Sequence, residues 1–209
     1  MAKHAVLVFL VLSAFLLGVA PMTASGSTPI WKRLKAKHPK TEKYLEQTPH
    51  SNVRAGGARV YIKAPLEATR ATVTDFDHYD NMISRFEDAR VIGKHGDQTD
   101  VYLKLPILGG RSHLSTVVRF DAPKRPAKDE YVITGTMIRG DFRQFRVSYH
   151  LKQVDDEGTM LTLRLLLDPK VPRVLAPKAY IEKEAASASD TAVRRLRDHS
   201  QKRAKRKQG

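Results

Sequence analysis

The sequence predicts an α+β fold in which an antiparallel sheet packs its apolar face against a long C-terminal helix. Segments between residues 101 and 167 alternate apolar and polar side chains, and turn sequences separate them. An amphipathic stretch at residues 177–197 follows the last of these segments. Such alternation is typical of an antiparallel sheet with one buried face and one face in water.

Residues 27–57 are interpreted as a basic N-terminal extension. Ser27 or Thr28 is expected to cap a short helix that has Pro29 at its first position. Gly56-Gly57 is expected to mark the boundary before the next element. The folded domain is therefore expected to span residues 58–198.

The first elements of this domain are a strand at residues 59–63 and a helix over residues 66–79. Alternation predicts the strand, and Ala64-Pro65 ends it. Glu67 lies in the first turn of the helix, where a negative charge is favourable. A second short helical segment is expected to run through Met82, Ile83 and Phe86.

A series of strands follows, at residues 101–107, 114–120, 131–138, 145–152 and 161–167. Asp155-Asp156-Glu157-Gly158 is typical of a hairpin turn, so the last two strands are expected to pair.

The predicted helix over residues 177–197 has an unusual apolar stripe. Its members follow helical spacing: Ile181, Ala185, Ala188, Ala192 and Leu196. Most are alanines, which leave volume unfilled against an aliphatic sheet. Either larger side chains of the sheet fill that volume, or a cavity remains.

Composition excludes several classes of protein. Lysine and arginine total 37 and aspartate and glutamate 22, so the formal net charge is +15. Cysteine is absent, which excludes disulfides, thiol catalysis and cysteine-ligated metals. Hydrophobic residues make up 41% of the chain, too many for a disordered protein.

Residues 1–26 are interpreted as a cleaved signal peptide. Lys3 precedes an apolar run over residues 5–20, and Ala24-Ser25-Gly26 offers a cleavage site. The run is shorter than the about 20 residues of a spanning helix, although an uncleaved anchor is the alternative. The protein is therefore expected to be exported, to the periplasm or outside the cell.

Local sequences match a known superfamily. Residues 60–67 and 73–79 resemble the opening of START/Bet v1-like (SRPBCC) proteins, and residues 140–143 and 156–159 fit the same pattern. Within that superfamily the chain is similar to the polyketide cyclase / coenzyme Q-binding group. The resemblance implies a helix-grip fold, with a curved antiparallel sheet wrapped around the C-terminal helix. It also implies a deep apolar pocket that holds a lipid, sterol, quinone or polyketide.

The pocket is expected between the apolar strand faces and the final helix. The expected ligand-binding residues are Val101, Leu103, Leu105, Phe145, Val147, Tyr149, Leu161, Leu163, Leu165, Ile181, Ala185, Ala188 and Ala192. For each of them ordinary core packing is the commoner role and the alternative to ligand contact. The apolar, proline-containing loop over residues 171–175 is the expected gate.

The sequence offers little for catalysis. It contains no nucleophile elbow, phosphate-binding loop or metalloprotease motif, and we expect no metal and no cofactor. Asp75, Asp77 and Asp80 are interpreted as a polar helix end rather than a calcium site. His113 and His150 are expected on the exposed sides of their strands.

An enzymatic alternative remains open. A cyclase acting on a polyketide or aromatic substrate would use Tyr149, His150, Arg143 or Asp141 near the pocket mouth. The favoured hypothesis is instead a non-catalytic carrier of a hydrophobic small molecule.

Both ends of the mature chain are basic. The tail over residues 199–209 can be a solvated segment, or it can attract anionic lipid headgroups. The expected membrane contacts are Trp31, Lys32, Arg33, Lys202, Arg203, Lys205, Arg206 and Lys207. Nucleic acid is not expected as a partner of an exported protein, although the tail would suit it if the leader were misinterpreted.

Overall fold

The computed structural model describes residues 28–83, 85–107 and 110–206. The leader and Lys207 lie outside these residues. The strands are β1 (Thr41–Glu46), β2 (Ala55–Ile62), β3 (Asp88–His95), β4 (Gln98–Ile107), β5 (Ser112–Phe120), β6 (Glu130–Gly140), β7 (Phe142–Gln153) and β8 (Thr159–Pro169). The helices are α1 (Ile30–Ala36), α2 (Leu66–Val73), the 3-10 turn η1 (Phe76–His78), α3 (Tyr79–Met82) and α4 (Lys178–Arg206).

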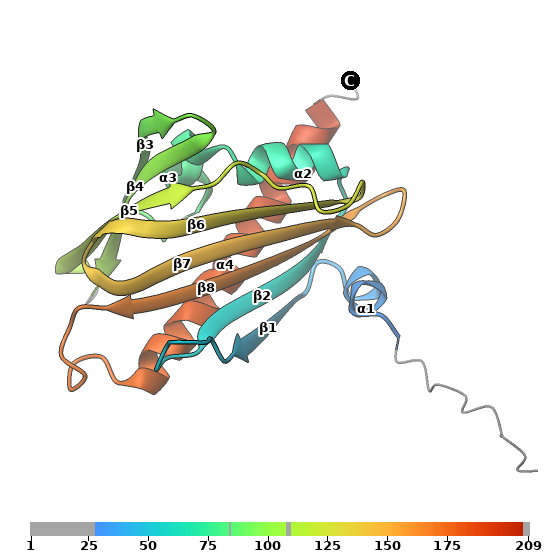
Figure 1. Cartoon of the computed structure of the whole chain (residues 1–209). Coiled ribbons are helices and arrows are strands. Elements are labelled where there is room, and N and C mark those ends of the chain that lie inside the picture. The colour runs from blue at the N-terminus through green and yellow to red at the C-terminus, as the bar shows by residue number, and fades with distance from the viewer. Residues whose placement is uncertain (1–27, 84, 108–109, 207–209) are drawn as a thin grey trace, which may run out of the picture.

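The strands form one antiparallel sheet that curves around α4 (Figure 1). Their order is β1-β2-β8-β7-β6-β5-β4-β3, so consecutive hairpins build the sheet from β3 to β8 and β2 then pairs with β8. The predicted α+β helix-grip architecture is confirmed.

The alternation that predicted the sheet is clearest in β7. Phe145, Val147 and Tyr149 are buried, whereas Arg146 and His150 are exposed. The hairpin predicted at residues 155–158 joins β7 to β8, with Gln153 paired to Thr159. The sheet therefore directs its large apolar side chains toward α4.

Helix α4 approaches the sheet most closely at β2. A Cβ atom on Gly56 would lie 2.1 Å from the backbone nitrogen of Ala186. Gly56-Gly57 lies within β2 rather than before it. The missing side chain of Gly56 allows the helix backbone to cross the strand, and that of Gly57 makes room for the ring of Tyr44. The sequence shows Gly56 but not the helix that requires it.

The helix expected over residues 66–79 is interrupted. It divides into α2, η1 and α3 because Asp75 leaves the helical conformation. The Tyr79 hydroxyl donates to the carbonyl of Val73, which replaces a helical hydrogen bond. The carboxylate of Asp75 contacts His78 and Arg203.

The sequence did not predict two of the strands. β1 and β3 form the two edges of the sheet, and both carry charged residues in place of clear alternation. β1 belongs to the segment 27–57 and pairs along β2. Within the same segment, α1 begins at Ile30 with Pro29 as its N-cap and without a side-chain cap, so the prediction of a Thr28 cap with Pro29 at the first helical position is wrong. Ser27, the alternative cap, lies outside the described residues.

Helix α4 continues to Arg206, well beyond the expected end at Arg197. Lysine and arginine are good helix formers, and cations are favourable in a last helical turn. Arg203 also donates to the carbonyl of Ala71, which ties this end to α2. Among the described residues, no helix is both long and apolar enough to span a membrane.

Candidate functional site

An apolar cavity of about 50 Å³ lies between the sheet and the middle of α4. Its walls come from four parts of the fold: α3 with the residues after it, strands β4 and β5, strands β7 and β8, and α4. The lining residues are Tyr79, Ile83, Arg85, Phe86, Leu103, Leu105, Phe120, Phe145, Val147, Tyr149, Leu163, Leu165, Leu167, Ala188 and Ala192.

Most of the residues predicted to bind the ligand line this cavity. They are Leu103, Leu105, Phe145, Val147, Tyr149, Leu163, Leu165, Ala188 and Ala192. Val101, Leu161, Ile181 and Ala185 are buried but do not line it, so their place is in the ordinary core. Alternation identifies the buried face of a strand, but it does not show where along that face packing is incomplete.

Sequence analysis missed part of the lining. Phe120 and Leu167 follow the same alternation as their predicted neighbours, so their strand pattern could have identified them. Tyr79, Ile83, Arg85 and Phe86 lie outside the strands, and only the folded chain brings them to the cavity.

Two hydroxyl groups lie in this otherwise apolar region. The hydroxyl oxygens of Tyr79 and Tyr149 are 3.4 Å apart, and both side chains are buried. Burial raises the pKa of Tyr149 to about 12 and raises the pKa of Tyr79 well above its usual range. Both phenols are therefore neutral at physiological pH, which suits an uncharged guest.

Arg85 brings a charge to the boundary of the cavity. Its guanidinium donates to Glu184 Oε2 at 3.1 Å and to Ser187 Oγ at 2.9 Å. Both acceptors lie on α4, so these bonds hold the segment before β3 against the helix. We call this set of contacts the Arg85 latch.

The loop over residues 171–175, expected to be a gate, does not line the cavity. Arg173 binds Asp168 at 2.8 Å, which ties the loop to the end of β8. Val174 and Leu175 are 85% and 73% exposed. The loop leads into the N-terminal end of α4, which lies away from the basic C-terminal turns of the helix (Figure 1).

The proposed catalytic residues are not gathered at the cavity. Tyr149 lines it, but Arg143 binds Asp168 and the carbonyl of Pro169. Asp141 accepts hydrogen bonds from the backbone and hydroxyl of Ser115. His150 is exposed on the other side of β7.

The remaining polar residues singled out in the sequence have separate partners. His150 lies 3.5 Å from Glu130, and the exposed His113 lies 2.6 Å from Glu87. Asp77 accepts from the backbone of Val91. Asp80 accepts from the backbone of Asn81, and Asp75 pairs with His78 and Arg203.

The predicted membrane contacts lie on α1 and on the last turns of α4. Trp31 is partly buried with Lys32 Nζ 5.5 Å from its ring centre, and Arg33 lies 3.6 Å from Glu42. Lys202, Lys205 and Arg206 are exposed, whereas Arg203 is partly buried. Arg197 donates to the carbonyl of Pro39, so the segment after α1 contacts the C-terminal half of α4.

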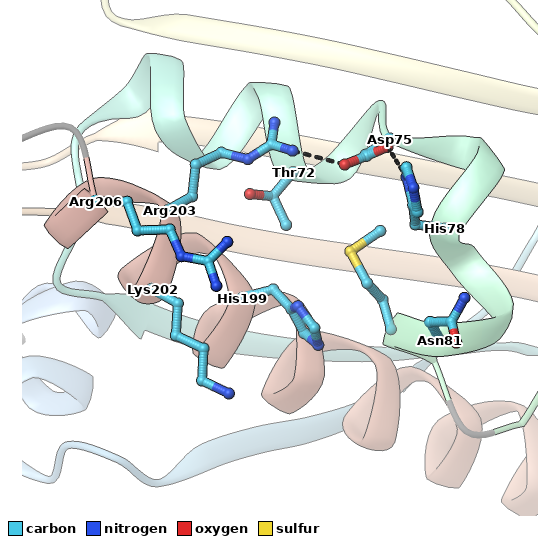
Figure 2. A pocket seen from close by; sticks show the side chains of 9 residues that line it. Thr72, Asp75, His78, Asn81, His199, Lys202, Arg203 and Arg206 are labelled. Atoms are coloured by element: carbon cyan, nitrogen blue, oxygen red, sulfur yellow. Dashed lines mark hydrogen bonds and ion pairs between the residues drawn. The ribbon is translucent and has the colours of Figure 1, made fainter.

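The basic end of α4 borders a second, polar cleft of about 510 Å³ (Figure 2). Its lining comes from α2, the η1–α3 corner and α4. The residues are Thr72, Asp75, His78, Asn81, Met82, His199, Lys202, Arg203 and Arg206.

Solved structures share this fold at low sequence identity. The STAR-related lipid transfer protein of Xanthomonas axonopodis is 15% identical, with a TM-score of 0.61 over 77% of this chain and 93% of that one. The lipid transfer and protein localization domain of human StarD13 is 14% identical, with a TM-score of 0.63 over 78% and 85%. A START superfamily protein of Mycobacterium smegmatis is 18% identical, with a TM-score of 0.56 over 72% and 96%.

No curated protein sequence matches the chain. The family model described as "Polyketide cyclase / dehydrase and lipid transport" matches residues 62–197. This range runs from the end of β2 into α4 and includes every residue that lines the apolar cavity. The START/Bet v1-like resemblance is thereby confirmed, and the chain belongs to the polyketide cyclase/dehydrase and lipid transport family.

Proposed function

We propose that the protein binds and carries a hydrophobic small molecule in the cavity between the sheet and α4. The supporting observation is the composition of the cavity wall, which is aliphatic and aromatic apart from two neutral phenols and Arg85. Burial of apolar area contributes about 25 cal/mol per Å², so a lipid-sized guest needs no charged partner.

The cavity must enlarge to accept such a guest. Its volume of about 50 Å³ is far below the roughly 300–1,000 Å³ typical of pockets for small molecules. Ile83 and Phe86 form a wall adjacent to α4, and the Arg85 latch joins the two walls. Release of this latch is the proposed opening step.

Extraction of the purified protein with organic solvent and mass spectrometry of the extract tests the proposal. A fluorescent fatty acid provides a titratable probe for saturable binding. We expect Ala188→Leu to weaken probe binding by about tenfold or more, because the larger side chain occupies the cavity. Ala179→Leu makes the same change at an exposed position of α4 and serves as the control.

Two results would contradict binding of a hydrophobic molecule in this cavity. No apolar molecule in the extract, together with no saturable binding of fatty acid, sterol or quinone, would overturn the proposal. Equal weakening by Ala188→Leu and Ala179→Leu would show that the probe binds elsewhere.

The second candidate is a cyclase, and the Tyr149 hydroxyl inside the cavity is the observation that favours it. Tyr149→Phe separates the two functions. A carrier should retain probe affinity within about threefold, because one weakly bonded hydroxyl is lost. A cyclase that uses this phenol should lose turnover of a polyketide substrate.

We also propose that the protein is exported through residues 1–26 and contacts anionic membranes through its basic ends. The charge-free apolar run and small residues before position 27 support export. The exposed cations of α4 support membrane contact. Mass spectrometry of the mature N-terminus tests the first part, and an intact Met1 would contradict cleavage.

A further inference from the structure

The polar cleft at the end of α4 is built from two separate parts of the chain. One wall is the α2–η1–α3 corner, and the other is the last turns of α4 (Figure 2). His199, Lys202, Arg203 and Arg206 are spaced three or four residues apart or adjacent, so they share one side of the helix.

Arg203 is a fixed charge within this cleft. It donates to the carbonyl of Ala71 at 2.7 Å and to Asp75 Oδ2 at 2.6 Å, and Figure 2 shows it extending from α4 toward Asp75. These bonds position the guanidinium before any ligand arrives, so its ordering entropy is already lost.

Lys202 and Arg206 differ from Arg203 in their ion-pair partners. Within the described part of the chain, neither has a carboxylate within ion-pair distance, although both line the cleft. The carboxylate in the lining, Asp75, already contacts both Arg203 and His78. The cleft therefore has more cationic than anionic groups, and its concave shape concentrates their field.

His199 adds a hydrogen-bonding group at the same wall. Burial lowers its pKa, and the neighbouring Lys202 lowers it further, so the ring is neutral at physiological pH. A neutral imidazole can still donate one N–H to an anion. Thr72 lies on the opposite wall, where its hydroxyl donates its proton to the carbonyl of Ala68, so it supplies no donor to an anion.

We propose that this cleft binds a phosphate group, with Lys202 and Arg206 as its direct ligands and Arg203 as a positioned neighbouring charge. Arginine and lysine bind phosphate oxygens through charge-assisted hydrogen bonds. The group can belong to a lipid headgroup or to a phosphate ester in solution. If the phosphate belongs to a lipid headgroup, this cleft is part of the membrane contact proposed above, and the inference then rests on that proposal. If the phosphate belongs to a soluble ester, the two are separate.

No residue lines both this cleft and the apolar cavity, and α3 contributes different residues to each. With a rise of 1.5 Å per residue, Arg203 lies about 16 Å along α4 from Ala192 in the cavity wall. A phosphate group in the cleft would therefore anchor the C-terminal end of α4 and leave the Arg85 latch accessible. Failure of the cleft to bind phosphate would not affect extraction of an apolar guest.

Two binding measurements on the full-length protein distinguish the sources. The first is a calorimetric titration with inorganic phosphate. The second is cosedimentation with vesicles of phosphatidylcholine, alone or mixed with phosphatidic acid. The test variant is Lys202→Gln/Arg206→Gln. The control is Lys183→Gln/Arg195→Gln, which removes the same charge from exposed positions of α4 outside the cleft.

We expect the test variant to weaken binding by about tenfold, because two charge-assisted contacts are lost, and the control to change it by about twofold or less. Cleft-dependent binding of inorganic phosphate would identify a soluble source. Cleft-dependent binding of phosphatidic acid vesicles without measurable binding of free phosphate would identify a headgroup. Equal losses in both variants, or no binding in either measurement, would overturn the proposal.

Discussion

Arg85 donates a hydrogen bond to Glu184 at 3.1 Å across the boundary between the segment before β3 and α4. Ser187 accepts a second bond from the same guanidinium at 2.9 Å. The contact joins two walls of the apolar cavity that are far apart in sequence. It is partly exposed to solvent, which makes it a contact that can open at modest cost.

Removal of the latch should accelerate guest exchange. Partly exposed ion pairs contribute about 0–1 kcal/mol, so Arg85→Ala should raise the dissociation rate of a bound fluorescent fatty acid by up to about fivefold. Stopped-flow measurement of probe release checks this. Arg90→Ala removes an equivalent exposed charge that pairs with Asp88, and its rate should match the wild type.

The crossing of α4 over β2 predicts a strong effect at Gly56. Gly56→Ala places a methyl group 2.1 Å from the backbone nitrogen of Ala186. The backbone cannot move away as a side chain could, so we expect a loss of about 3 kcal/mol or more in the free energy of unfolding. Chemical denaturation measures it.

Gly93→Ala is the matched control for Gly56. A Cβ atom at Gly93 would meet its nearest neighbour, a ring nitrogen of His95, at an ordinary 3.5 Å. Its unfolding free energy should change by about 1 kcal/mol or less. Similar losses in the two variants would show that helix–strand contact is not the cause.

The buried contact between Glu182 and Arg54 at the start of α4 predicts that the protein loses stability in acid. Its side chain is 3% exposed, and Arg54 donates to both carboxylate oxygens. Burial opposes ionisation, but the side-chain and backbone hydrogen bonds from Arg54 outweigh it and lower the pKa of Glu182. A carboxyl whose pKa is lower when folded stabilises the fold at neutral pH, and this contribution is lost as the pH falls below about 4.

Glu182→Gln tests this linkage. The variant should be about 2 kcal/mol less stable at neutral pH, because hydrogen bonds to a charged group are lost. Its deficit should shrink as the pH falls below about 4. Denaturation curves at several pH values measure both effects. Glu157→Gln removes an exposed carboxylate and should show a small deficit throughout; a similar deficit in both variants would contradict the prediction.

The raised pKa of the buried Tyr149 predicts that the protein loses stability at alkaline pH. Burial raises its pKa to about 12, so the folded state favours the neutral phenol. This contribution is fully present below the unfolded pKa of about 10 and is lost as the pH rises from there toward about 12. In an ultraviolet titration, Tyr149→Phe should lose one of the late phenolate signals of the wild type and keep the one that belongs to Tyr79. Tyr180→Phe removes an exposed phenol, and loss of the same late signal there would refute the assignment.

Local patterns in the sequence determined most of the sheet and the position of α4. Alternation in β7 and the turn at residues 155–158 depend on neighbouring residues, whose periodicity reports the buried face directly. The same reasoning identified most of the cavity wall. The resemblance in residues 60–67 and 73–79 led to the correct superfamily.

The tertiary structure decided the features that depend on distant contacts. Arg85 with Glu184 and Asp75 with Arg203 are pairs about a hundred or more residues apart. Periodicity shows which side of an element is apolar, but it carries no information on the distance to the opposing element. The size of the cavity, the latch beside it and the basic cleft at the end of α4 therefore emerge only when the sheet and helix pack together.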